Sequence, residues 1–510
     1  MDIPQEIAAP PSPRAGVLAR MAGGTGWIIG WRMASRVLGL GSTLILARIL
    51  VPADFGLVTL AYGLVTTVDA MAMPDAEDAV VRAEAPSAMM YHTAYTMSLL
   101  RGFATAIVIT LVAEPIGRFF GEPRLALVLW ALALGTVLQG ACSVGLIDFR
   151  RDLAFGKEFV LLLLPRLLSI AVTLTAALVW RSYWALVMGI LAGKVARLAL
   201  SFAMHPYRPR LGLVAWRDLI GFSCWGWAIG MAGLVRSRID SFVLGRVMDP
   251  AAVGLFSIGE EVATLPTTEL VAPLCRAAFS GFVVARDAGE SMTDTYLRAV
   301  SFAFLLTLPG GLGISLIADP LVRVSVGSQW LDAIPVIQVL GPVGALAVFG
   351  YVSSVLFSVH ALMARQFTVM LGALAFRVAL LVPLVERNGV LGAAVAGAVG
   401  FSAEQILMSA LAHRRYGLSL GEILGRIWRI IVASIAMTAA LVATGLGWGA
   451  TGSDPLGAIV LAAAVGAAVY GASLFALWLT CGRPGGAEAD FLTLLRQSCA
   501  RVMQTSAEDA

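Results

Sequence analysis

Long runs of apolar residues, separated by short polar segments, fill almost the whole chain. A helix that spans the hydrocarbon core of a bilayer needs about 20 mostly apolar residues, and run after run reaches that length. The pattern predicts an all-α polytopic membrane protein with about fourteen transmembrane helices. The predicted spans are 23–47, 55–73, 91–113, 125–147, 158–180, 182–204, 219–246, 251–283, 293–318, 333–358, 367–385, 389–411, 427–449 and 456–479.

The eighth run, residues 251–283, differs from the others because it is long and carries several charges. Pro266 and Pro273 interrupt it. Its charged residues are Glu260, Glu261, Glu269 and Arg276. Proline breaks the hydrogen bonding of a helix, and charge is costly in lipid. We therefore predict a kinked or partly interfacial helix here.

One short stretch occurs twice, each time at the joint between two apolar runs. Residues 46–57 read LARILVPADFGL and residues 244–255 read LGRVMDPAAVGL. A second pair, LVWR at 178–181 and LVER at 384–387, recurs at nearly the same separation. Proline can begin a helix but cannot continue one, and glycine lets two backbones approach closely. The repetition predicts a duplicated chain.

The two copies of the repeat each begin a set of about six predicted helices. An even number of spans separates them, so the halves would share one orientation and be related by an axis along the membrane normal. The predicted parts are a cytoplasmic N-terminal extension (1–22), an N-terminal six-helix bundle (23–204), a C-terminal six-helix bundle (219–411), two additional transmembrane helices (427–479) and a cytoplasmic tail (480–510).

Composition supports a membrane protein, and charge placement predicts its orientation. The chain is 59% hydrophobic and 13% charged, whereas a soluble protein carries about 25% charged residues. The net charge of +4 is small, but the basic residues of the connections gather on one side of the predicted membrane. That side includes Arg150, Arg151, Arg414 and Arg415 as well as both ends of the chain. The positive-inside rule then places both termini in the cytoplasm.

Several classes of enzyme find no support in the sequence. The connections between spans are too short to bury a core of their own. There is no Gly-Lys-Ser/Thr phosphate loop, no carboxylate pair in a large loop and no His/Cys cluster with metal-ligand spacing. The five cysteines are scattered along the chain. We predict a transporter without a cofactor, without a metal site and without a nucleic-acid partner.

Arginines inside the predicted spans are the first candidates for function, because a charge at membrane depth is costly and normally faces a cavity or a partner. They are Arg32, Arg36, Arg101, Arg236, Arg238 and Arg377. Arg32 and Arg36 lie one helical turn apart on one face. A planar guanidinium binds phosphate oxygens in pairs, so we interpret these residues as the lining of a cationic cavity for an anionic substrate. The alternative is that they snorkel or pair within the bundle.

Three carboxylates inside spans, Asp69, Asp240 and Glu404, are candidates for ion coupling. An alternative applies to two of them. Asp240 lies one turn from Arg236 on the same helix, so these two side chains could form a structural pair. Asp69 lies near the end of its span, where water can reach it.

Four segments make the chain resemble the polysaccharide and oligosaccharide flippases, whose superfamily also contains the multidrug-and-toxin exporters and the lipid II flippases. These segments are residues 47–56, 149–155, 240–246 and 327–330. The resemblance covers nearly the whole chain. It implies two six-helix bundles and two extra helices that rock between inward-facing and outward-facing states.

The resemblance also implies a cargo and a location. The cargo would be an oligosaccharide repeat unit linked to undecaprenyl diphosphate, moved across the bacterial inner membrane for capsule, exopolysaccharide or lipopolysaccharide O-antigen synthesis. Arg32, Arg36 and Arg238 would hold the diphosphate. Expected partners are this lipid-linked oligosaccharide, membrane lipids, a polysaccharide polymerase and the export machinery.

Two other functions stay open at this point. An organic-cation or drug exporter of the same fold would need a cavity rich in carboxylates, against which the central arginines argue. A membrane polysaccharide polymerase would need a large loop with acid and base residues, and the loops are short.

Overall fold

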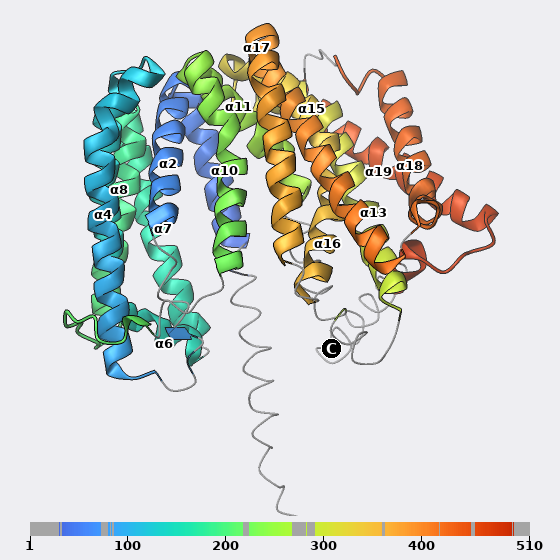
Figure 1. The fold of residues 1–510 in the computed structure, drawn as a ribbon. Helices are drawn as coiled ribbons and strands as arrows, with labels where there is room; N and C mark the ends of the chain where they lie inside the picture. The colour runs from blue at the N-terminus through green and yellow to red at the C-terminus, as the bar shows by residue number, and fades with distance from the viewer. Residues whose placement is uncertain are drawn as a thin grey trace, which may run out of the picture. The chain divides into compact units, whose positions relative to one another are not determined.

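The computed structural model describes residues 30, 33–72, 80–217, 224–267, 282, 291–359, 363–449 and 454–493, except for 82, 84, 85, 153, 418 and 492. All regular structure in these residues is helical (Figure 1). The all-α prediction is therefore confirmed.

Among the described residues, eight helices are long and apolar enough to cross a membrane. The number rises to ten when two bent pairs are each counted as one span: residues 124–140 with 144–151, at 62°, and 328–344 with 347–357, at 44°. The chain is thus polytopic as predicted. The total of about fourteen spans stays a prediction, because several predicted spans fall partly outside the described ranges.

The eighth predicted span begins as α11 (Pro250–Ala263). Its helical stretch is described as far as residue 267. The second proline of this run, Pro273, and the charged Glu269 and Arg276 lie outside the described residues. The predicted kink therefore stays a prediction.

The chain divides into two compact units. Unit 1 contains Met1–Leu50 and Ala61–Ser223, and unit 2 contains Val51–Leu60 and Cys224–Ala510. The helix α2 (Pro52–Ala72) is divided between them at Leu60. This division does not test the predicted scheme of two six-helix bundles with two added helices, which stays a prediction.

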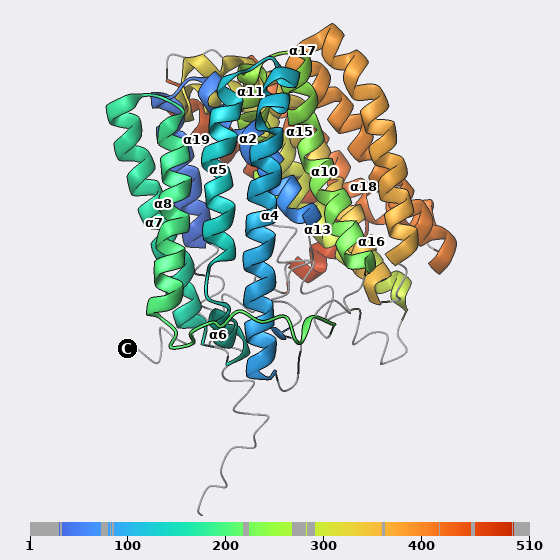
Figure 2. The same cartoon turned by 60° about the vertical axis from the view of Figure 1, so that its left-hand side comes forward.

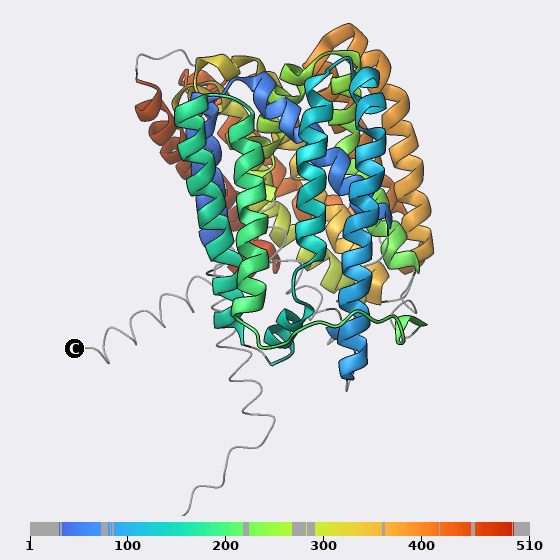
Figure 3. The same cartoon turned by 90° about the vertical axis from the view of Figure 1, so that its left-hand side faces the viewer.

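Close helix packing in unit 1 depends on small residues. α4 (Ala88–Phe120) runs along α5 (Arg124–Gly140), and α7 (Phe155–Trp180) runs along α8 (Trp184–Ala203) (Figures 2 and 3). A Cβ atom at Gly102 would lie 2.6 Å from the Thr136 carbonyl oxygen. Glycine at this position lets the two backbones approach, as small residues do in many membrane helices.

An extended strap, residues 204–217, follows α8 and crosses α4 (Figure 3). Its backbone N–H groups at Gly212 and Ala215 donate to the hydroxyl groups of Thr96 and Thr93, at 3.0 and 3.2 Å. The Tyr207 hydroxyl lies 2.6 Å from His92 Nδ1. Burial is the largest cause that raises the pKa of Tyr207 to about 12, and the charges of Tyr91 and Tyr95 act in the same direction. The strap is thus held to the surface of unit 1 by directed hydrogen bonds.

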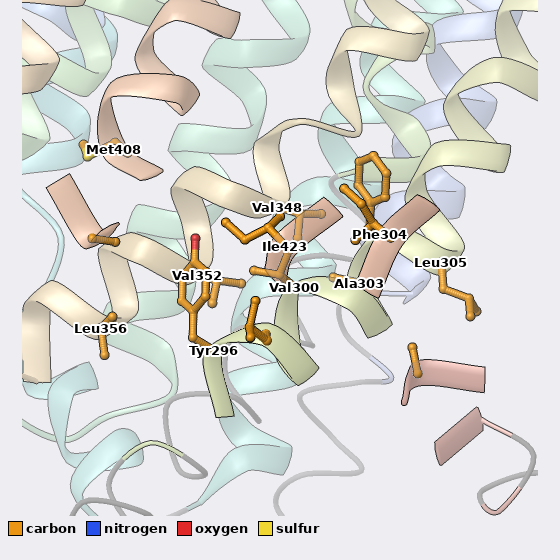
Figure 4. Packing of buried hydrophobic residues seen from close by; sticks show 14 of the residues in the cluster. Tyr296, Val300, Ala303, Phe304, Leu305, Val348, Val352, Leu356, Met408 and Ile423 are labelled. Carbon is orange, nitrogen blue, oxygen red and sulfur yellow. The ribbon is translucent and has the colours of Figure 1, made fainter. Parts of the chain in front are cut away.

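The apolar core of unit 2 lies where α13 (Met292–Leu316), α16 (Ala347–Val359), α17 (Met363–Tyr416) and α18 (Leu420–Ala443) meet (Figure 4). Tyr296 is fully buried there, and its hydroxyl lies 3.1 Å from Ser353 Oγ. Unit 2 also contains α10 (Cys224–Val247), α14 (Ala318–Ser325), η2 (Ser328–Ala333), α15 (Ile334–Gly344) and α19 (Pro455–Thr480).

The helix α17 folds back on itself at Gly389, whose φ of 57° and ψ of −134° are not helical. This confirms the predicted break between spans 367–385 and 389–411. The corresponding turn of the other repeat lies at Arg181, between α7 and α8, and Arg181 also has a positive φ of 47°. The first copy of the second repeated pair therefore ends at a helix turn, and the second copy ends two residues before one.

The proline turns of the two copies of the first repeated stretch meet inside unit 2, to which residues 51–60 and 250–255 both belong. Pro52 and Pro250 begin α2 and α11, and Asp249 caps α11 by accepting a hydrogen bond from the Ala252 N–H at 2.8 Å. A Cβ atom at Gly56 would lie 1.6 Å from the Pro250 carbonyl oxygen. A Cβ atom at Gly254 would lie 2.1 Å from the Pro52 carbonyl oxygen. Each glycine thus makes room for the other copy's proline turn.

We expect Gly254→Ala to lower the free energy of unfolding by about 1–3 kcal/mol or more, because the new methyl group must displace backbone rather than a flexible side chain. Thermal unfolding of the purified chain in detergent measures the change. Gly372→Ala is the matched control in the same unit, since Gly372 is helical and exposed and nothing lies within 4 Å of its added Cβ. Equal melting of Gly254→Ala and wild type would contradict the close approach.

Candidate functional site

All three carboxylates that the sequence singles out lie in ion pairs with arginines that it singles out. Arg101 pairs with Asp69 in unit 1. Arg377 pairs with Asp240, and Arg236 pairs with Glu404, in unit 2. The structure therefore brings these six predicted site residues together as three separate pairs.

The pair in unit 1 joins α2 to α4. Arg101 Nε lies 3.5 Å from Asp69 Oδ1, and the Thr105 hydroxyl donates to the same oxygen at 3.3 Å. A further cation, Lys194 on α8, acts on Asp69 electrostatically and donates to Gln139 Oε1 at 2.7 Å. Lys194 is not among the residues predicted from the sequence. Its charge near the middle of the predicted span 182–204 was the signal that could have identified it.

The Arg377–Asp240 pair is the most deeply buried of the three. Only 9% of Arg377 and 2% of Asp240 are exposed. Arg377 donates to both carboxylate oxygens, with Nε 3.2 Å from Oδ1. Gly397 and Gly400, on the returning half of α17, leave room for this side chain, because a Cβ at Gly400 would lie 2.6 Å from Arg377 Cβ. The hairpin at Gly389 thus builds the pocket in which the pair sits.

The Arg236–Glu404 pair joins the same two helices. Arg236 Nη1 donates to Glu404 Oε2 at 3.1 Å, and its guanidinium carbon lies 5.9 Å from the centre of the Phe401 ring. The ring face adds a cation–π attraction to the charge pair. α10 and α17 are therefore joined by two ion pairs.

The expected pairing of Arg236 with Asp240 within α10 is wrong. Both residues lie on one face of the helix, as predicted, but α17 supplies each with a partner from outside it. The buried, two-pronged geometry with Arg377 is stronger than an exposed contact between neighbouring helical turns. Long-range packing, which periodicity does not reveal, decides the partners.

The remaining predicted arginines, Arg32, Arg36 and Arg238, do not belong to the three ion pairs described above. Arg238 is half-buried, and its Nε is buried without a hydrogen-bond partner among the described atoms. Arg36 lies half-buried on the helix of residues 33–49 in unit 1. Arg32 lies outside the described residues. The two described arginines belong to different units, so their joint use stays a prediction.

A cavity of about 650 Å³ opens inside unit 2 between α10, α11, α15, α16 and α17. Both members of the Arg236–Glu404 pair line it, and so does Arg377. Glu260 also lines it, within electrostatic range of Arg377, Arg238 and Arg236. The described part of the chain contains no group of three His, Cys, Asp or Glu side chains placed to hold a metal ion.

Comparison with known proteins identifies a family that the chain matches. A profile of the family described as polysaccharide biosynthesis protein matches residues 45–335, which is more than half of the chain.

Two curated relatives share low identity over long stretches. The lipopolysaccharide biosynthesis protein WzxC of Escherichia coli (strain K12) is 23% identical over 78% of this chain and 80% of its own length. The succinoglycan biosynthesis transport protein ExoT of Rhizobium meliloti (strain 1021) is 24% identical over 61% of this chain, which spans 64% of that protein.

Solved structures show the same fold. The lipid II flippase MurJ, in an inward closed conformation, superposes with a TM-score of 0.69 at 14% identity, over 89% of this chain and 99% of its own. An inward-facing MATE family multidrug transporter superposes with a TM-score of 0.58 at 13% identity, over 75% of this chain and 94% of its own. The chain therefore shares the fold of these two membrane proteins.

We expect Arg377→Gln alone to lower the free energy of unfolding by about 3–5 kcal/mol, because it leaves the Asp240 carboxylate buried without its counter-ion. Adding Asp240→Asn should recover most of that loss, since two amides can still hydrogen-bond and neither is charged. Thermal unfolding of the two single variants and the double variant gives the coupling energy. Additive losses would mean that the two side chains do not depend on each other.

Proposed function

The chain belongs to the family of polysaccharide biosynthesis proteins, and on that premise we propose that it flips lipid-linked oligosaccharide repeat units across the bacterial inner membrane. The carrier in this proposal is undecaprenyl diphosphate. The movement runs from the cytoplasmic to the periplasmic leaflet by alternating access, and it supplies repeat units for an exopolysaccharide, a capsule or an O-antigen.

The observation that carries the proposal is the fold of a lipid II flippase over 89% of the chain, in a chain whose family profile is one of polysaccharide biosynthesis. The names of both curated relatives refer to biosynthesis of a polysaccharide or lipopolysaccharide, and one of them is a transport protein. A lipid carrier fits apolar helices because its tail can remain in the bilayer while its polar part crosses.

In this proposal the central arginines have two different tasks. Arg101, Arg236 and Arg377 hold carboxylates inside their own units, so they organise the helices rather than bind the cargo directly. Arg36 and Arg238, together with Arg32, bind the diphosphate of the carrier. An unpartnered buried guanidinium nitrogen, as at Arg238, is suited to a phosphate oxygen.

The pairing of these arginines with carboxylates also affects which residues could couple transport to an ion. Asp69, Asp240 and Glu404 stay candidates for coupling, but each would have to release its arginine before it could carry a proton or a sodium ion. Both termini in the cytoplasm, a cationic central cavity and docking of a polymerase or the export machinery also stay predictions.

One observation favours a second candidate, an organic-cation exporter. Glu260, Glu261 and Glu404 line the unit 2 cavity, and carboxylates attract cations. The fold is compatible with this function, since a MATE family multidrug transporter shares it. If the chain is such an exporter, deleting its gene would leave the surface glycan unchanged. If the chain is a flippase, the deletion would remove the surface glycan.

The experiment uses a deletion strain complemented with variants, in which lipid-linked oligosaccharide is measured separately in the two membrane leaflets. We expect the deletion to accumulate complete lipid-linked units on the cytoplasmic face and the wild-type chain to restore export. Arg36→Ala and Arg238→Ala should each reduce export by about tenfold or more, since a charge-assisted hydrogen bond contributes about 1.5–3 kcal/mol.

Arg387→Ala is the matched control. Arg387 is exposed beside the Gly389 turn, so its loss should leave export unchanged. Normal export by Arg36→Ala and Arg238→Ala, both present in the membrane at wild-type amounts, would remove these residues from the diphosphate site. Unaltered surface glycan in the deletion strain, with toxic cations accumulating in the cell, would favour the exporter.

A further inference from the structure

The unit 2 cavity carries little unpaired positive charge, although two of the predicted cationic residues line it. Arg236 is neutralised by Glu404, and Arg377 is neutralised by Asp240 directly behind the cavity wall. Glu260 and Glu261 add negative charge to the same lining. A phosphate group would therefore lose its hydration here without gaining a free guanidinium, which makes the cavity a poor site for the diphosphate.

Neutral hydrogen-bonding groups fill the rest of the polar lining. Gln405 is 5% exposed and lines the cavity, and its Oε1 is buried with no hydrogen-bond partner among the described atoms. Gly350 leaves room for this oxygen, since a Cβ there would lie 1.9 Å from it. A buried amide oxygen without a donor is costly, and a ligand hydroxyl would remove that cost.

A second buried amide lies on the same cavity wall. Gln366 is 8% exposed and donates from Nε2 to the Ser354 hydroxyl at 3.1 Å. An amide offers two N–H donors and one acceptor oxygen. The contact with Ser354 uses only one of the two donors. Amides can both donate and accept, and so can hydroxyl groups, which makes them matching partners.

Aromatic rings complete the lining. Tyr351 is about half exposed and Phe401 lies beside Arg236. A ring face is apolar while a tyrosine hydroxyl is polar. Amide groups, hydroxyl groups and aromatic faces in one cavity suit a ligand that is apolar on its C–H faces and polar at its edges, which is the chemistry of a sugar ring.

We propose that the unit 2 cavity is a saccharide subsite that binds an uncharged, hydroxyl-rich sugar of the cargo, with Gln405 and Gln366 as its hydrogen-bonding residues and Tyr351 as an aromatic platform. This role presupposes the flippase function proposed above and adds to it a place that recognises sugar rather than phosphate. The volume of about 650 Å³ lies within the usual range for small-ligand sites.

The test measures binding to the purified full-length chain in nanodiscs by isothermal titration calorimetry. The probe is the repeat-unit oligosaccharide, released from its lipid carrier by mild acid, taken from the strain that makes the polysaccharide. We expect wild type to bind it, and Gln405→Met and Gln366→Met each to bind it about tenfold more weakly, because methionine keeps the volume but loses the amide. Tyr351→Leu should weaken binding as well.

Two control variants test whether the loss of binding is specific to the residues of the saccharide subsite. Thr368→Val changes an exposed side chain on α17 near Gln366, and binding should remain as in wild type. Arg238→Ala should bind the free oligosaccharide normally while failing to export, because its proposed partner is the diphosphate. Since two glutamine positions are tested, failure of one variant to fold leaves the other to decide.

Three results would overturn the subsite: no binding of the oligosaccharide to wild type, binding unaffected by both glutamine variants, or competition for the cavity by inorganic diphosphate or tetraphenylphosphonium. The assay of lipid-linked oligosaccharide in the two leaflets distinguishes failure of the subsite from failure of the flippase function. Export by wild type without oligosaccharide binding would refute the subsite alone, whereas a wild-type chain that restores no export would refute the flippase function.

Discussion

Apolar helices that contain charged side chains depend on each charge finding a partner, and the Arg377–Asp240 pair is the clearest case in this chain. Both side chains are almost fully buried, and the guanidinium donates to both carboxylate oxygens. Neither charge could stay at this depth alone. The pair joins α10 to α17, and Gly397 and Gly400 on the returning half of α17 leave room for the arginine.

Charge pairing also determines which residues are available to a ligand. Once Arg101, Arg236 and Arg377 are committed to carboxylates, the number of cations open to an anionic cargo is much smaller than the sequence suggests. The cavity next to two of these pairs has both of its arginines paired with carboxylates, and its lining is rich in amide and hydroxyl groups. A cargo that joins a diphosphate to neutral sugars would meet two kinds of surface, one suited to each part.

The sequence predicted features that depend on local chemistry. Apolar runs of sufficient length located the helices, and Gly389 ends a helix where a break was expected. Six of the ionisable residues that the sequence singled out lie in three ion pairs. Their partners were not predicted, because Asp240 finds its arginine 137 residues away rather than one turn away. Gln405 was overlooked as well, since a glutamine in an apolar run carries no charge to attract notice and its missing partner is visible only in three dimensions.

The reciprocal contact between the two copies of the repeated stretch is isologous in kind: the same residue types meet on both sides, as in a symmetric dimer. Pro52 occupies the space that Gly254 leaves, and Pro250 occupies the space that Gly56 leaves. Neither copy can therefore drift independently at this point, because a side chain added to one glycine collides with the backbone of the other copy. The joint thus places the same steric limit on two positions that are almost two hundred residues apart in the sequence.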